Sequence, residues 1–260
     1  MIAIYDLVKQ YGRFTAVNGV SLDVTPGEIH GFLGPNGAGK TTTLRMIAGL
    51  LKPTSGRIEV NGHDLAVEPE AAKASLGFIP DRPYIYEKLT AGEFLRFHGG
   101  LFGVNGGRGG DGIDSRVHDM LELFELGQWE HELVESFSHG MKQRLVMSAA
   151  FLHRPRAVVV DEPMVGLDPR GARLIKDVFR RMSTRGVAIL MSTHTLEVAE
   201  ELCDRISIIF KGQIIARGTV PELRAMADRG PDGDAGHQLT SVFLKLTGGS
   251  ALQEIDEAVG

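Results

Sequence analysis

The stretch GPNGAGKT, residues 34–41, constrains the fold more than any other feature of this sequence. It matches the pattern G-x-x-x-x-G-K-[ST]; the apolar run IHGFL leads into it and the helical run TTLRMIAGL leads out. Glycines in such a turn let backbone N–H groups point at phosphate oxygens, and the helix that follows adds the positive end of its dipole. The stretch therefore predicts a strand–loop–helix unit that binds phosphate within an α/β fold.

Every residue of this loop is a candidate for nucleotide binding. Lys40 would bring positive charge to the β and γ phosphates, and the hydroxyl of Thr41 would bind Mg²⁺. An ordinary glycine-rich turn would leave this Lys–Thr pair unexplained. The predicted nucleotide-binding residues are Gly34, Pro35, Asn36, Gly37, Ala38, Gly39, Lys40, Thr41 and Thr42.

A second apolar run, AVVVDEP at residues 157–163, ends in two carboxylates. Asp161 would hold Mg²⁺ through water, and Glu162 is placed to act on an attacking water as general base. Acidic residues are common at strand ends, so this interpretation depends on the phosphate loop in the same chain.

Two further residues become candidates only in combination with these motifs. His194 follows the apolar run VAILMST and could sense a γ-phosphate, although a lone histidine there also suits a structural role. Tyr11 precedes the early β segments and could stack on a purine ring, or equally pack in the core.

Short apolar runs alternate with helical patterns along the whole chain. The predicted strands are 21–24, 28–34, 56–60, 76–79, 157–161, 187–192, 206–210 and 213–218; the predicted helices are 40–50, 90–102, 115–126, 140–152, 169–184, 195–203 and 220–227. Buried strands that alternate with helices predict a mainly parallel sheet. The early strands and Asn61-Gly62 predict an antiparallel β piece near the N-terminus. The glycine-rich segment 99–112 predicts a flexible loop, and 227–238 a polar linker.

Charge and composition narrow the class of function. The net charge of −5 and the pI of about 6.0 argue against nucleic-acid binding, which needs a basic face. Cys203 is the single cysteine, so no intrachain disulfide can form and a reducing compartment is the simplest setting. We find no signal peptide and no run of the ~18 apolar residues that a spanning helix needs. Any membrane contact would therefore go through a partner.

Taken in order, these motifs resemble those of the nucleotide-binding subunit of ABC transporters, over residues 1–225. The resemblance implies a P-loop NTPase core with a mainly parallel sheet, an N-terminal antiparallel β subdomain and a helical signature subdomain at about 82–155. It bounds the ATPase domain at 1–226 and leaves 227–260 as a linker and short C-terminal extension. Tyr11 matches the position that stacks on adenine, GPNGAGKT the Walker A loop, Glu162 the catalytic position and His194 the switch histidine.

The same resemblance gives a role to the run SHGMKQR, residues 138–144, which stands at the place of the signature sequence LSGGQ. It implies that Ser138, His139 and Gly140 contact ATP held by a second subunit. A helix start with free N–H groups suits such an anion contact, although a serine there is also a common helix cap. GLDP, residues 166–169, matches the D-loop and contains Asp168.

The sequence departs from the family pattern in two places. In the signature, Phe137 replaces leucine and His139 replaces glycine. In FIPDRPYIYEKLT, Asp81 stands where the family has a glutamine that contacts Mg²⁺ and the attacking water, in a loop that docks the membrane subunit. An aspartate can still bind Mg²⁺ but has no amide donor, which leaves its effect on hydrolysis and coupling open.

The resemblance implies an ATPase that uses ATP and Mg²⁺ with a membrane permease and a second ATPase subunit, identical or related. Such a subunit lies on the cytoplasmic face of the cell membrane through its permease and is soluble alone.

The segment SVFLKLTGG, 241–249, resembles the short C-terminal segment of ABC subunits that serve exporters. A surface segment that packs on the core would have the same appearance in the sequence. Two other interpretations stay open: a soluble ABC-type ATPase of DNA repair or translation, and a nucleotide-binding regulatory module with little turnover. The absence of an Asn-Lys-x-Asp motif argues against a GTPase.

Overall fold

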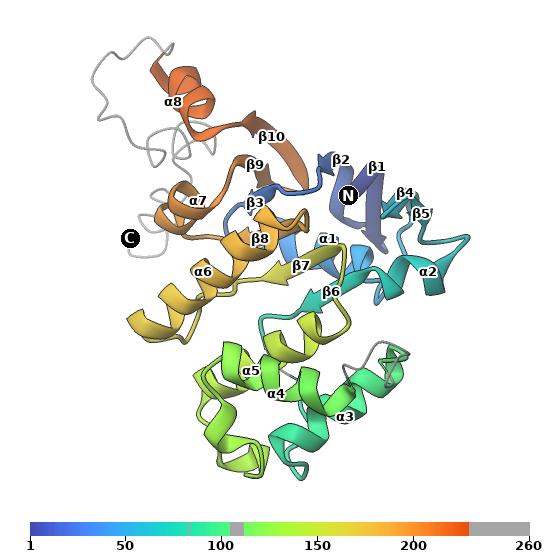
Figure 1. The fold of residues 1–260 in the computed structure, drawn as a ribbon. Coiled ribbons are helices and arrows are strands. Elements are labelled where there is room, and N and C mark those ends of the chain that lie inside the picture. Colours follow the sequence, from blue (N-terminus) through green and yellow to red (C-terminus); the bar gives the residue numbers. More distant parts are fainter. Residues whose placement is uncertain (83, 105–111, 229–260) are drawn as a thin grey trace, which may run out of the picture.

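The computed structural model describes residues 1–82, 84–104 and 112–228 (Figure 1). The centre of the predicted glycine-rich loop and all but the first two residues of the predicted linker and C-terminal extension lie outside the described residues. Those first two residues, 227 and 228, belong to the last helix. Among the described residues, no helix has the length and apolar character required to cross a membrane.

The described residues form two sheets and the helices that cover them. The strands are β1 (Ile2–Tyr11), β2 (Phe14–Val24), β3 (Ile29–Leu33), β4 (Ser55–Val60), β5 (His63–Asp64), β6 (Leu76–Ile79), β7 (Ala157–Asp161), β8 (Ala188–Thr193), β9 (Arg205–Phe210) and β10 (Gln213–Gly218). The helices are α1 (Lys40–Ile47), α2 (Pro69–Ala74), α3 (Ala91–Leu101), α4 (Ile113–Leu123), α5 (His139–Leu152), α6 (Pro169–Thr184), α7 (Leu196–Leu202) and α8 (Val220–Asp228), with short 3₁₀ turns at Gly127–Trp129 and Val134–Ser136.

The larger sheet has the order β10-β9-β3-β8-β7-β6. Its strands are parallel except β10, which pairs with β9 in the antiparallel sense at one edge. Successive side chains of a strand point to opposite faces. Val158 and Val160 of β7 accordingly pack in one core cluster, and Val159 packs in the other. Because both faces are covered, the strands read as continuous apolar runs, and the prediction of a mainly parallel sheet is confirmed.

The smaller sheet is antiparallel, in the order β2-β1-β4-β5. Asn61 and Gly62 form the predicted turn between β4 and β5, both with positive φ, at 52° and 85°. The first strand, β1, was not predicted. Its pairing with β2 shifts register at several points and Asp6 has a φ of 44°, so the two-residue alternation that signals a strand is broken. Helix α2 was also missed, because six residues are too few to show a helical period.

Helices α3, α4 and α5 pack together as a lobe beyond the β6 edge of the larger sheet, green in Figure 1. Gly99 belongs to α3 and is not part of a loop. A Cβ at this position would come within 2.9 Å of Ile113 and of Leu152, so glycine here permits close packing of three helices. The predicted loop began at residue 99, but α3 continues to Leu101. Composition alone cannot distinguish a glycine in a turn from a glycine at a close helix contact.

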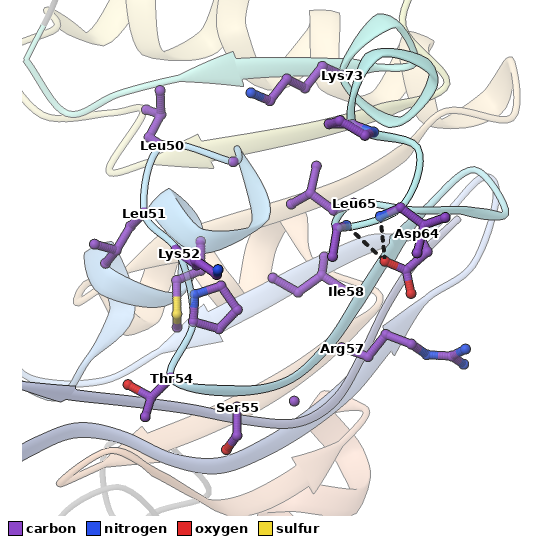
Figure 2. Close-up of a pocket in the computed structure, with 17 residues that line it drawn as sticks. Leu50, Leu51, Lys52, Thr54, Ser55, Arg57, Ile58, Asp64, Leu65 and Lys73 are labelled. Atoms are coloured by element: carbon purple, nitrogen blue, oxygen red, sulfur yellow. Dashed lines mark hydrogen bonds between the residues drawn. The ribbon is translucent and has the colours of Figure 1, made fainter.

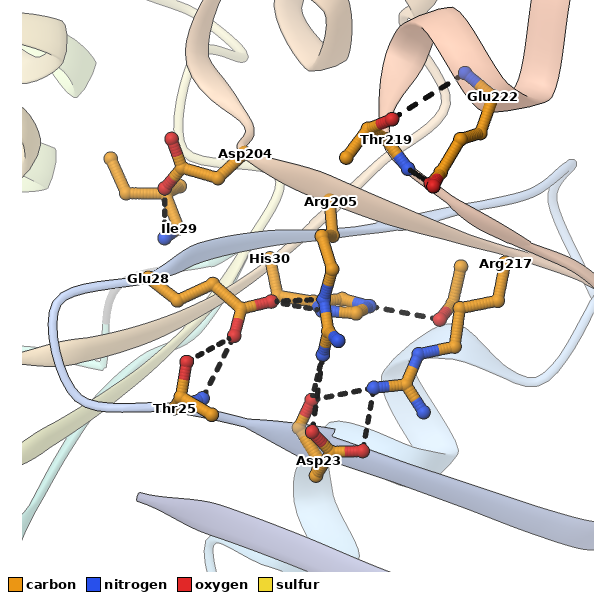
Figure 3. A network of polar contacts seen from close by, with 11 residues as sticks. Asp23, Thr25, Glu28, Ile29, His30, Asp204, Arg205, Arg217, Thr219 and Glu222 are labelled. Atoms are coloured by element: carbon orange, nitrogen blue, oxygen red, sulfur yellow. Dashed lines mark hydrogen bonds and ion pairs between the residues drawn. The ribbon is translucent and has the colours of Figure 1, made fainter. Parts of the chain in front are cut away.

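A polar network joins the two sheets at the end of β3 that lies away from the phosphate loop (Figure 3). Arg205 of β9 donates to Glu28 Oε1 at 2.8 Å and to the Asp23 carbonyl at 2.9 Å. Arg217 of β10 donates to Asp23 Oδ1 at 2.6 Å. These contacts tie β2 of the smaller sheet to β9 and β10 of the larger one.

Inside this network, a serine, a histidine and a glutamate lie in a row. His30 Nε2 is 2.8 Å from Ser207 Oγ, and His30 Nδ1 is 2.9 Å from Glu28 Oε1. Burial would raise the pKa of Glu28, but hydrogen bonds from His30, Thr25 and Arg205 outweigh it and hold this pKa at about 2. Because His30 and Ser207 have no exposed surface, no substrate can reach them, and we assign the row a structural role.

Candidate active site

A pocket of about 370 Å³ opens over the loop between β3 and α1. Among the predicted residues, its lining includes Tyr11, residues 35–37 and 39–42, and the carboxylates Asp81, Asp161 and Glu162. Parallel strands end at one edge of a sheet, and here β3, β6 and β7 bring the loop and the carboxylates to that edge. Gly34 and Ala38 belong to the loop but lie behind this lining.

Two positions of the loop have no room for a side chain, and at Gly39 the backbone is also left-handed. Gly39 has a φ of 107°, and a Cβ there would lie 2.6 Å from the carbonyl oxygen of Ala16. At Gly34 a Cβ would lie 2.4 Å from the carbonyl oxygen of Ile209. The loop is therefore wedged between β2 and β9, and α1 begins directly after it at Lys40.

Lys40 is the cation of the pocket and is only 6% exposed. Its Nζ donates to the carbonyl oxygens of Gly34 at 2.6 Å and Pro35 at 3.2 Å, and lies 3.7 Å from Glu162 Oε1. Burial lowers the pKa of Lys40, against the attraction of Glu162 and Asp161. A bound phosphate could replace these carbonyl contacts with charge-assisted hydrogen bonds, which are roughly twice as strong as neutral ones.

Asp161 is the most buried carboxylate of the pocket, at 2% exposure. It accepts hydrogen bonds from the hydroxyls of Ser192 and Thr41. Burial raises the pKa of Asp161 against these hydrogen bonds, and the nearby charges of Asp81 and Glu162 raise it further. Because Asp81 and Glu162 both repel the negative charge of Asp161, a cation beside Asp161 would stabilise this arrangement.

These donors fit Mg²⁺, which takes oxygen ligands and keeps several waters. Among the described residues, no group of three or more histidine, cysteine, aspartate or glutamate side chains is placed to hold a metal ion. A Mg²⁺ site of the phosphate-binding kind needs fewer, because one or two protein oxygens are completed by water and by the phosphates themselves. Thr41 and Asp161 are the pair that the pocket offers for this.

Glu162 and His194 are in direct contact. Glu162 Oε1 lies 2.9 Å from His194 Nδ1. The backbone at Glu162 has a φ of 49°, a turn that any residue but glycine adopts rarely, and it ends β7 beside the pocket. Glu162 lines the pocket, whereas His194 does not and reaches it through the glutamate. The pairing of these two side chains could not be read from the sequence.

The predicted signature residues lie at a different place. Ser138 begins α5 as its N-cap, and its Oγ accepts from the Met141 N–H at 3.3 Å. Together with His139, Gly140 and Asp168 it lines a hollow of about 340 Å³. Among the described residues, this hollow and the phosphate pocket have no lining residue in common. One copy of the chain therefore does not bring the signature to its own phosphate loop.

The signature also contacts the predicted D-loop within the chain. The His139 ring packs on Gly166, where an added Cβ would come within 2.5 Å of Cδ2 of the imidazole. Asp168 begins α6 as its N-cap, and its Oδ1 accepts from the Gly171 N–H at 2.7 Å. The His139 ring therefore holds the D-loop against α5, and the Asp168 cap fixes it at the start of α6.

A hollow larger than the phosphate pocket lies elsewhere, at the end of α1 beside β4 and α2 (Figure 2). Its volume is about 720 Å³, and its lining combines apolar side chains such as Leu50, Ile58 and Leu65 with Lys52 and Lys73. Its described lining contains none of the residues predicted from the motifs, so size alone would have selected the wrong site.

Comparison with known proteins gives the same family that the order of the motifs suggested. The ABC transporter family profile matches residues 17–165. The linearmycin resistance ATP-binding protein LnrL of Bacillus subtilis is 38% identical over 86% of this chain and 70% of its own length. The Nod factor export ATP-binding protein I of Paraburkholderia xenovorans is 38% identical over 85% of this chain and 72% of its own.

Solved structures show the same fold. The structure of an ATP-binding subunit of an ABC transporter, 33% identical, covers 95% of this chain and 99% of its own with a TM-score of 0.85. Dimeric ATP-binding cassettes at 23% and 24% identity, both with TM-scores of 0.76, share the fold alone. The α/β fold with its two subdomains is thereby confirmed. This chain belongs to the ABC transporter family, as an ATP-binding subunit with the ATPase activity that energises transport.

Proposed function

We propose that this ATPase closes head to tail with a second subunit, identical or related, on two ATP molecules, and drives export through a membrane permease. Export is supported by the relatives, one named for resistance to an antibiotic and one for export of Nod factor. Membership of a transporter family favours this function over a soluble role in DNA repair or translation. The intact pocket, with Lys40, Asp161, Glu162 and His194 within it or beside it, favours turnover over regulatory binding alone.

The observation that carries the proposed chemistry is the 2.9 Å contact between Glu162 and His194 beside Lys40. In this proposal Lys40 offsets the charge of the β and γ phosphates, while Thr41 and Asp161 hold Mg²⁺. Mg²⁺ bound by these two residues would supply positive charge beside the phosphate oxygens. Glu162 accepts the proton of the attacking water, and His194 orients the Glu162 carboxylate.

The second subunit is proposed because the signature stands apart from the phosphate pocket of its own chain. The N-cap of α5 presents a hydroxyl and backbone N–H groups, the groups that bind an anion at a helix start. In a head-to-tail pair, Ser138, His139 and Gly140 of one subunit would contact the γ-phosphate held by the other.

A permease-docking surface is proposed at the loop that follows Asp81. Tyr84 and Tyr86 are 81% and 61% exposed, and the ring of Tyr86 packs edge-on against Phe97 of α3 with 5.4 Å between centroids. Exposed aromatic residues that cluster in this way are typical of protein–protein contacts. The loop also carries Asp81 into the pocket, so one segment would join the permease to the nucleotide.

The test of this function is co-expression with a candidate permease from a neighbouring gene. Together they are expected to sediment with membranes at the cytoplasmic face, and ATP hydrolysis is expected to respond to permease substrate. Expressed alone, the chain is expected to be soluble and to leave protein-free liposomes unbound. Tight binding to such liposomes would contradict docking through a permease.

Asp81 is proposed as a ligand on the Mg²⁺ side of the pocket. Asp81 and Asp161 line the same pocket, and the charge of Asp81 contributes to the raised pKa of Asp161, which supports this proposal. An ionised carboxylate attracts Mg²⁺ more strongly than the amide that the family usually has there, but it also repels the γ-phosphate. We therefore expect slow but measurable hydrolysis with a strong dependence on Mg²⁺.

The expected result is that Asp81→Ala raises the Mg²⁺ concentration needed for half-maximal ATPase activity, while Asp81→Gln is tolerated. Coupling to the permease should weaken in Asp81→Ala more than ATP binding does. A Mg²⁺ titration of the ATPase rate for the wild type and both variants decides the question. Superimposable curves would show a solvated loop carboxylate that does not contact the metal.

A further inference from the structure

We propose that Phe14 is a second aromatic residue of the nucleobase site, beside Tyr11, and contributes to the affinity for ATP through contact with the purine ring. The proposal rests on the placement of ATP in the pocket over the phosphate loop. No motif of the sequence pointed to Phe14, because the hairpin that carries it begins with the strand that was not predicted.

The β1–β2 hairpin sets the position of both rings. Tyr11 is the last residue of β1, Phe14 the first of β2, and the two are directly opposite in the register. Directly opposite residues of an antiparallel pair project from the same face of the sheet, with Cβ atoms about 4.5–5.5 Å apart. The two aromatic side chains therefore leave the hairpin on one side.

That side faces the phosphate loop. Phe14 and Ala16 are two residues apart in β2, so they share a face, and the carbonyl of Ala16 is the group that Gly39 approaches. Tyr11, Phe14 and Ala16 all line the same pocket as Lys40 and Thr41. The hairpin thus forms the wall of the pocket that continues from the loop.

Phe14 is 64% exposed, so most of the surface of this large apolar ring is available for contact with a ligand. Among the ring contacts of the described residues, Phe14 has none, while Lys9 Nζ lies 5.1 Å from the centroid of the Tyr11 ring. The lysine occupies part of the tyrosine surface by a cation–π contact. The phenylalanine ring is left open toward the pocket.

The chemistry of this wall is that of stacking and apolar contact. Phe14 and Ala16 have no polar side-chain atom, and the side chains of the pocket that carry charge belong to the phosphate and metal end. A base recognised in this way needs an aromatic ring at position 14 and not a particular hydrogen bond. Loss of one stacked base contact weakens affinity by roughly 5- to 100-fold in nucleic-acid sites.

The experiment compares equilibrium binding of ATP and of inorganic triphosphate to the purified full chain. Phe14→Ala is expected to weaken ATP binding roughly 5- to 100-fold and to leave triphosphate binding unchanged, whereas Phe14→Tyr keeps both. Tyr5→Ala, which removes an exposed aromatic of β1 outside the pocket lining, is the matched control and should bind ATP as the wild type does.

A tryptophan at position 14 would detect the contact between the base and the ring by fluorescence. Trp129 is the single tryptophan of the chain, so Phe14→Trp in a Trp129→Phe background places one indole at the wall. ATP is expected to quench its fluorescence, and inorganic triphosphate is not. Wild-type ATP affinity in Phe14→Ala, or equal losses for ATP and triphosphate, would overturn the proposal. ATP binding that is unchanged by Lys40→Ala would instead contradict the placement of ATP in this pocket.

Discussion

Glu162→Gln is expected to lower steady-state ATP hydrolysis by roughly 10²–10⁴-fold, the scale of a positioned general base, and to leave ATP binding intact. Glutamine has the shape of glutamate and can keep the 2.9 Å contact with His194, but it cannot accept the proton of the attacking water. The variant therefore removes the proton acceptor while the arrangement of side chains in the pocket stays the same.

The same change should favour the ATP-bound state. Glu162 holds a negative charge 3.7 Å from Lys40 Nζ, in a pocket that also contains Asp81 and Asp161. Removing one carboxylate reduces repulsion toward the γ-phosphate and frees Lys40 from a competing partner. We therefore expect Glu162→Gln to accumulate as a dimer with ATP in both sites, visible by gel filtration with ATP and Mg²⁺.

Two further variants sharpen the result. His194→Ala should reduce the rate because the Glu162 carboxylate loses its orienting contact, while ATP affinity stays close to that of the wild type. Glu201→Gln removes a surface glutamate that pairs with Lys176 and should leave the rate unchanged. Near-normal hydrolysis by purified Glu162→Gln would exclude this glutamate as the base.

Much of the site was predictable because its parts are short and local. The loop at 34–41 requires glycines at defined steps, and a strand that ends in Asp161 and Glu162 is visible in a run of seven residues. Parallel strands then bring these two segments to one edge of the sheet without further information. The convergence of the loop and the carboxylates follows from topology alone.

What could not be predicted depends on contacts between distant segments. Strand β1 was missed because its bulges break the alternation, and Phe14 was missed with it. Gly99 lay in both the predicted helix 90–102 and the predicted loop 99–112; it belongs to α3, where it allows three helices to approach closely. The Glu162–His194 contact joins the ends of two strands, and no local pattern records the orientation of their side chains.

Neighbouring residue types can also mislead. Ser138 and His139 are adjacent in sequence and suggest a nucleophile with its base, but the serine is a helix cap and the histidine packs on Gly166. The serine and histidine that do share a hydrogen bond are Ser207 and His30, far apart in sequence and fully buried. A catalytic pair needs both a contact between the two side chains and access for a substrate, and neither of these pairs of described residues combines the two.

Ser138→Arg is expected to abolish ATP hydrolysis while the ATP affinity of the isolated subunit stays nearly unchanged. The affinity should hold because the hollow at Ser138 and the phosphate pocket have no lining residue in common within the described chain. The activity should fall because a long cation would fill the hollow and remove the N-cap of α5. Ser136→Arg, two residues earlier and outside that hollow, is the matched control and should remain active.

Mixing distinguishes action across an interface from a defect within one subunit. Lys40→Ala is inactive through its own pocket but keeps an intact Ser138, and Ser138→Arg keeps an intact Lys40. In a mixed dimer, one site combines the intact Lys40 of the first subunit with the intact Ser138 of the second, and the other site combines both defects. If the signature acts on the partner's nucleotide, the mixture regains hydrolysis that neither variant shows alone. If Ser138 serves its own pocket, every subunit carries a defect and the mixture stays inactive.

Single-turnover phosphate release should be measured, since it detects one active site even where continuous turnover needs two. An inactive mixture in that assay, with mixed dimers demonstrated, would place the signature's role within its own subunit.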